Sequence, residues 1–149
     1  MPTENATPVT TLTNKIARLK IVARDMLRAK LINPRLSKIN ELEANIKNLN
    51  AYKADLKLDL DTEIYEISKL DVDHPKYDKT KAKKEEYVKS LSEVIAEKDK
   101  ENVEIEKMIA EQKEKIQKIE TGETKVSLED LNDLVDTLLR QDALNQVAE

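Results

Sequence analysis

The chain has 149 residues and a formal net charge of −4 at pH 7, and 38% of its residues are charged. It contains no Cys, Phe or Trp and a single Gly. The lack of Cys excludes disulfides and thiol catalysis, and the lack of large aromatic residues argues against an ordinary compact core. Glu, Lys, Leu and Ala at heptad spacing instead predict long helices and a coiled coil.

The chain begins with a polar segment that contains two of its four Pro residues. We predict that residues 1–10 form a disordered tail. A helical period then starts, which predicts an amphipathic helix over 11–32. The apolar face of this helix is formed by Leu12, Ile16, Leu19, Ala23 and Met26.

The same helix is basic, with Lys20, Arg24 and Arg28 predicted to form a stripe opposite the apolar face. We expect the helix to stop at Ile32. Asn33 suits an N-cap and Pro34 suits the first position of the next helix, where its missing N–H does no harm.

Residues 34–121 are predicted to form an antiparallel coiled-coil hairpin. Its turn is expected at 71–79, where Pro75 interrupts the helical pattern. Gly122 suits the left-handed residue that ends a helix. Ser127 with Asp130 resembles a capping box, which predicts an acidic amphipathic helix over 127–147. The fold class is therefore all-α, a long hairpin flanked by two short helices.

Each arm of the hairpin carries apolar residues at positions a and d of a heptad, which form its seam. In the first arm the a and d residues are Ile39, Leu42, Ile46, Leu49, Lys53, Leu56, Leu60, Glu63, Ile67 and Leu70. In the second arm they are Val88, Leu91, Ile95, Lys98, Asn102, Ile105, Ile109, Gln112, Ile116 and Ile119.

One antiparallel register satisfies both seams and places the turn beside Pro75. The apolar pairs of this register are Leu42 with Ile109, Ile46 with Ile105, Leu56 with Ile95, and Leu60 with Leu91. It also sets Lys53 against Lys98, with Asn102 one step away. We interpret these three residues as a polar layer that specifies register, with ammonium groups reaching Glu97, Glu101 or Asp55. The alternative is a hinge or a contact for an anionic partner.

The hairpin brings the basic helix 11–32 and the acidic helix 127–147 to the same end. They are expected either to pack on each other or to dock on a partner protein or a second copy. For the acidic helix the candidate contacts are Leu131, Val135 and Leu138, which share one face with Leu128.

No pattern predicts catalysis, a cofactor or a metal. His74 is the sole His, and its Asp neighbours lack the Gly and the bidentate Glu of a calcium loop. A two-helix rod also lacks the concave site that catalytic carboxylates need. We therefore expect a protein that is not an enzyme and takes no small-molecule substrate.

Lysines also gather just after the turn, at Lys76, Lys79, Lys81, Lys83 and Lys84. Together with the basic helix they allow a second hypothesis, binding to an anionic partner such as nucleic acid or a membrane surface. The acidic balance of the whole chain argues against it.

The sequence favours a structural or protein–protein interaction protein that self-associates or joins a larger assembly. Candidate contexts are an assembly scaffold, a small inhibitor, or a component of a particle such as a phage virion. Leu58, Ile64 and Val94 flank the seam and are expected to stay partly exposed. The chain shows no signal peptide and no apolar run long enough to span a membrane, so we expect a soluble cytoplasmic protein.

Overall fold

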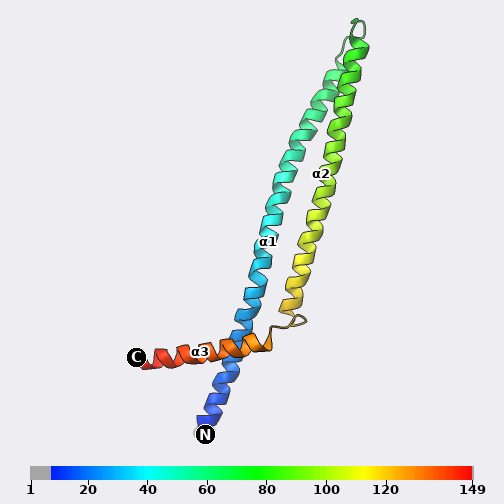
Figure 1. Cartoon of the computed structure of the whole chain (residues 1–149). Helices are drawn as coiled ribbons and strands as arrows, with labels where there is room; N and C mark the ends of the chain where they lie inside the picture. Colours follow the sequence, from blue (N-terminus) through cyan, green and yellow to red (C-terminus); the bar gives the residue numbers. More distant parts are fainter. Residues whose placement is uncertain (1–7, 149) are drawn as a thin grey trace, which may run out of the picture. The chain divides into compact units, whose positions relative to one another are not determined.

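The computed structural model describes residues 8–148, and the side chains of residues 11–147. Within this part of the chain there are three helices and no strand, α1 (Pro8–Ser68), α2 (Tyr77–Glu120) and α3 (Leu128–Ala148) (Figure 1). The predicted all-α class is confirmed. Of the tail expected at 1–10, residues 1–7 lie outside the described residues, whereas residues 8–10 belong to α1.

The chain divides into two compact units. We call Lys38–Gln112 the hairpin unit, because it holds the facing parts of α1 and α2. We call Met1–Ser37 together with Lys113–Glu149 the terminal unit, because it holds both chain ends.

The helix break expected at Asn33–Pro34 is wrong. α1 continues through Pro34, which lies inside the helix. Proline there removes one backbone hydrogen bond, the one that the Lys30 carbonyl would accept. Buried residues lie on both sides of the proline, Ala23 before it and Ile39 after it. The burial that anchors each side of α1 outweighs the loss of one bond, and the N-capping pattern of Asn33 goes unused.

In the hairpin unit α1 and α2 lie side by side and run in opposite directions (Figure 1). The connection spans residues 69–76, close to the predicted turn. His74 Nδ1 accepts a hydrogen bond from the Lys76 amide at 3.0 Å, and Asp71 Oδ1 accepts one from the Asp73 amide at 3.0 Å. These side chains therefore replace helical hydrogen bonds within the turn.

Burial in the hairpin unit follows the heptad. Between residues 39 and 70 each predicted a or d position is buried or half-buried, and every other residue is exposed. In α2 the a and d positions are likewise buried or half-buried. Other half-buried residues of α2 are Tyr77, Thr80, Lys81, Lys84, Val94 and Lys118. Leu56, Leu91 and Ile95 form one cluster, with Leu60 and Val94 packed against it. The members of two predicted pairs, Leu56 with Ile95 and Leu60 with Leu91, are thus found in one cluster.

The C-terminus of α2 and the N-terminus of α3 have the predicted caps. Gly122 has φ 82°, the left-handed conformation that lets α2 end, and its amide donates to the Ile119 carbonyl at 3.2 Å. Ser127 Oγ accepts a hydrogen bond from the Asp130 amide at 3.3 Å, as an N-cap residue does. The loop between these caps directs the chain into α3.

In the terminal unit α3 packs against the first part of α1 (Figure 1). The core of this contact is Ala23, Leu131 and Val135, all buried. The half-buried residues around it are Ile16, Leu19, Leu27, Leu134, Leu138 and Leu139. Ala23 is completely buried because its small side chain lets α3 approach α1 closely. Of the faces predicted for the two helices, Leu12, Met26 and Leu128 stay outside this core, 51%, 48% and 70% exposed.

Candidate protein-interaction groove

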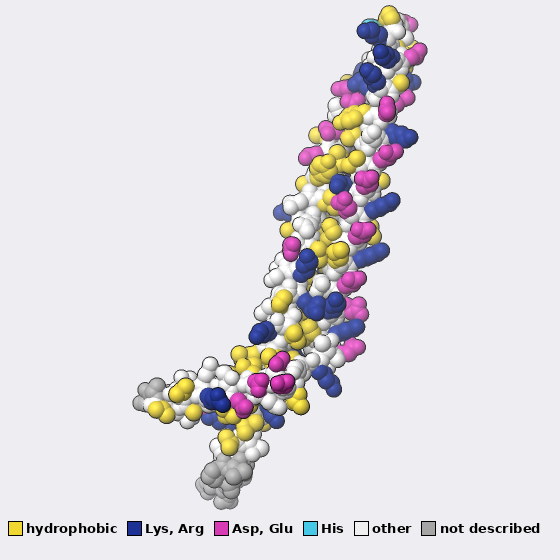
Figure 2. All heavy atoms as spheres, viewed as in Figure 1, with side chains coloured by type: hydrophobic (Ala, Val, Ile, Leu, Met, Phe, Trp, Pro, Cys, Tyr) yellow, Lys and Arg dark blue, Asp and Glu magenta, His cyan; other side chains and the backbone are white. Residues whose placement is uncertain are grey.

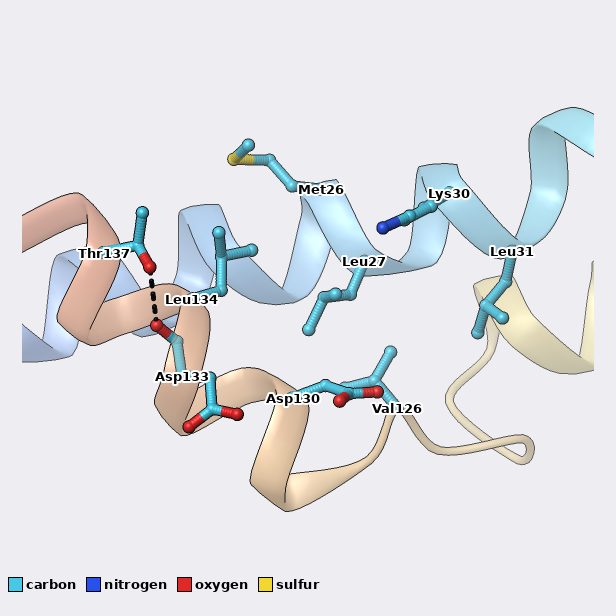
Figure 3. A pocket seen from close by; sticks show the side chains of 9 residues that line it. All are labelled: Met26, Leu27, Lys30, Leu31, Val126, Asp130, Asp133, Leu134 and Thr137. Carbon is cyan, nitrogen blue, oxygen red and sulfur yellow. Dashed lines mark hydrogen bonds between the residues drawn. The ribbon is translucent and has the colours of Figure 1, made fainter.

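A groove of about 680 Å³ lies in the terminal unit. Its lining comes from α1, from α3 and from the loop before α3 (Figure 3). The lining residues are Met26, Leu27, Lys30, Leu31, Val126, Asp130, Asp133, Leu134 and Thr137. The groove therefore has an apolar floor and a charged rim.

The apolar floor stays open to solvent. Leu27 points from α1 toward α3, and Leu31 projects from the same side of α1 (Figure 3). Met26 and Leu31 remain 48% and 44% exposed, whereas the neighbouring Leu27 is packed against the core. Large apolar side chains left together at the edge of a core are typical of interaction sites.

The rim is mostly acidic. Asp130 and Asp133 lie on the α3 side, opposite the leucines of α1 (Figure 3). Thr137 Oγ1 donates a hydrogen bond to the Asp133 carbonyl at 3.0 Å, so its proton is already used within α3. Lys30 is the single cation of the lining. The groove suits an apolar occupant that carries a positive charge.

The predicted contact residues of α3 lie inside the terminal unit. Leu131 and Val135 are 4% and 5% exposed, and Leu138 is packed against them. This face of α3 is thus covered by α1 of the same chain. At the other end of the contact, Lys15 forms an ion pair with Asp142, whose Oδ2 is buried and has no other partner.

The predicted basic stripe is not opposite the packed face. Arg24 and Arg28 are half-buried and, with Lys125, line a second hollow of about 390 Å³ beside Leu131. Arg28 lies 3.4 Å from the position that a Cβ of Gly122 would take. A cation there interacts favourably with the C-terminal end of α2. Lys20, in contrast, is exposed.

The predicted polar layer lies in the hairpin unit. Lys53 forms an ion pair across the seam with Asp99, rather than with Asp55. This contact holds the pKa of the Asp99 carboxyl below its ordinary value, chiefly through the hydrogen bond from Lys53. Asn102 donates to the Asn50 side chain at 2.9 Å.

The second lysine of the layer is satisfied on its own helix. Lys98 lies 3.3 Å from Glu101, an expected partner, and 5.6 Å from the centre of the Tyr52 ring. The two lysines therefore leave the seam in different directions, which relieves the repulsion of a Lys–Lys layer.

The lysines near the turn have different surroundings. Lys84 is half-buried and contacts Glu66 at 2.7 Å and Glu63 at 3.4 Å, which raises its pKa, mainly through the hydrogen bond to Glu66. Lys76, Lys79 and Lys83 are exposed. Lys84 is thus part of the hairpin packing, and three of the four predicted contact lysines remain on the surface.

The described residues contain no group of three or more potential metal ligands. None of the described helices combines the length and apolarity needed to cross a membrane. Comparison of the chain with protein-family models, curated proteins and solved structures finds no match.

The groove itself was missed by reading the sequence. The sequence pattern places Met26 on the packed face, whereas Met26 borders an open hollow together with Leu31. A sequence signal for the groove is the width of the apolar face of α1. Leu27 and Leu31 make this face wider than the surface that a single packed helix covers.

Proposed function

We propose that the chain is a non-catalytic structural or protein-interaction protein. In this function the hairpin unit is a helical scaffold, and the groove of the terminal unit binds another protein within a larger assembly. Suitable contexts are an assembly scaffold, a particle component such as that of a phage virion, or a small inhibitor.

The proposal rests on the number of apolar side chains that are exposed on the surface. Of the described residues, 11 hydrophobic side chains are buried, whereas 17 large hydrophobic side chains are exposed. Single exposed apolar residues are ordinary on protein surfaces, but here the exposed Met26 and Leu31 border one groove together with the half-buried Leu27 and Leu134. Leu58 and Ile64 add to this surface on the hairpin unit, at 65% and 50% exposure. Burying such residues against a partner removes apolar area from water, which stabilises a complex.

Site-specific photo-cross-linking tests the proposal. A benzophenone amino acid replaces Leu31 in the groove, and a matched control carries it at Lys100, an exposed polar position of α2. We expect cross-links to protein at position 31 in extracts of the native source, or to the chain itself, and few at position 100. Equal labelling at the two positions, together with a monomer in sedimentation equilibrium, contradicts the proposal.

A second candidate function is binding to an anionic polymer. It is favoured by the hollow where Arg24, Arg28 and Lys125 lie together, and by the exposed Lys76, Lys79 and Lys83 near the turn. Phosphate backbones bind such cations in a salt-dependent way.

Titration of labelled DNA and of anionic vesicles at low and at raised salt tests this candidate. Binding that weakens with salt and is lost in Arg24→Glu with Lys125→Glu supports the hollow as its site. Absence of binding at low salt, where charge attraction is strongest, removes the candidate.

A further inference from the structure

One face of α3 carries two complementary surfaces. Its residues follow each other three and four positions apart and are all exposed. In chain order they are Asp130, Asp133, Thr137, Arg140, Leu144 and Val147. Figure 2 shows acidic side chains over the first turns of α3 and hydrophobic ones over its last turns. The first half of this face borders the groove.

The second half of this face of α3 consists of Arg140, Leu144 and Val147. We call this apolar projection with one positive charge the knob. Leu144 and Val147 are 69% and 85% exposed, and with Arg140 and Ala143 they border a shallow apolar hollow. This knob has the properties that the groove requires of an occupant, apolar side chains beside a cation.

We infer that the groove is filled by the last turns of α3 from a second copy of the chain, in a reciprocal exchange between two copies. The inference rests on the proposed function, because it names the partner of the same groove. Arg140 of each copy then faces the acidic rim formed by Asp130 and Asp133 of the other. Leu144 and Val147 cover the apolar floor at Met26 and Leu31.

The geometry of α3 makes this contact intermolecular. Groove and knob belong to one continuous helix, Leu128–Ala148. From Thr137 to Val147 such a helix extends about 15 Å away from the groove. A continuous helix does not fold back on itself, so the knob of one copy cannot enter its own groove.

The two surfaces also fit two-fold symmetry. Because the groove lies at the start of α3 and the knob at its end, an antiparallel pair of α3 helices brings each knob to the opposite groove. Such an isologous contact forms twice and closes, which gives a dimer rather than a filament. Lys30 on the groove suits the partial negative charge at the arriving helix C-terminus.

Sedimentation equilibrium of the full chain tests the inference. We expect a dimer for the unsubstituted chain and a monomer for Leu144→Glu with Val147→Glu, and for Leu31→Glu. The matched control is Val103→Glu, a 50% exposed apolar residue of the hairpin unit, which should leave the dimer intact. Circular dichroism checks that each variant keeps its helices.

A charge exchange tests the pairing directly. Asp133→Arg and Arg140→Asp should each weaken the dimer about tenfold, because every dimer loses two exposed charge pairs. An equimolar mixture of the two variants should recover dimers, since one of the two contacts is then native and the other has its charges swapped. Failure of the mixture to recover, with both single variants folded, overturns the pairing.

The outcomes separate this inference from the proposed function. A monomeric chain whose position 31 still cross-links to a different protein overturns the inference and keeps the function. A dimer that resists all these substitutions shows self-association through another surface and also overturns the inference. A monomer without cross-links at position 31 removes both.

Discussion

The hairpin unit and the terminal unit bury their apolar side chains by different rules. In the hairpin unit burial repeats with the heptad, and Leu56 of α1 belongs to one cluster with Leu91 and Ile95 of α2. In the terminal unit Ala23 meets Leu131 and Val135, residues from distant parts of the chain with no shared repeat. The periodic unit buries its seam residues along two antiparallel helices, whereas the non-periodic unit leaves a groove between α1 and α3. The difference shows that a heptad repeat spreads burial evenly along the helices, whereas a crossing of two helices concentrates it in one core.

The largest effect is expected from a substitution that disrupts the terminal unit and leaves the hairpin unit folded. Leu131→Asp places an unpaired charge in the core of the terminal unit and should detach α3 from α1, at a cost of several kcal/mol. Hydrogen exchange should then accelerate in α3, while residues 39–67 of α1 keep their protection. The control is Leu128→Asp on the same helix, where the side chain is already 70% exposed. Equal loss of protection in both units contradicts the comparison.

A smaller effect is expected at Pro34. Because the proline lies inside α1, Pro34→Ala restores one helical hydrogen bond and should raise the free energy of unfolding by about 2 kcal/mol. Urea denaturation measures the change, with Ser37→Ala as a control at a nearby exposed helical position. Destabilisation by Pro34→Ala instead indicates that a helix starts at this proline, as its sequence context suggests.

The polar layer of the hairpin unit comes next. Lys53→Leu combined with Lys98→Leu fills both seam positions with apolar side chains and should stabilise the chain by about 1–2 kcal/mol. Their partners Asp99 and Glu101 are 56% and 51% exposed, so water replaces the lost ion pairs. Thermal unfolding measures the gain, and Lys100→Leu at an exposed position is the control. A loss of stability shows that the ion pairs, rather than seam burial, dominate at this layer.

The smallest effect concerns pH. The pKa of Asp99 is lowered by Lys53, so its folded-state carboxylate is favoured. Its contribution to stability is therefore present above the ordinary pKa of 3.8 and is lost as pH falls through the lower folded-state pKa. We expect the stability difference between the unsubstituted chain and Asp99→Asn to shrink on acidification below that range. A difference that stays constant with pH shows that the ion pair contributes nothing.

The sequence by itself determined the helical class, the hairpin and its caps. Heptad spacing places seam residues on one side of each helix, and Gly122 and Ser127 act through the backbone of their own neighbours. Such information is local, so it can be read without knowing the fold. The error at Pro34 has the same origin, because a local start signal was given more weight than the burial on both sides of it.

Only the tertiary structure decided which partners the charged residues have and where the groove lies. Lys53 reaches Asp99 rather than Asp55, and Arg28 lies beside Gly122, because long side chains choose among several charges within reach. The groove depends on how closely α3 approaches α1 at Ala23. That approach results from side-chain volumes on two distant segments, and a one-dimensional pattern does not contain it.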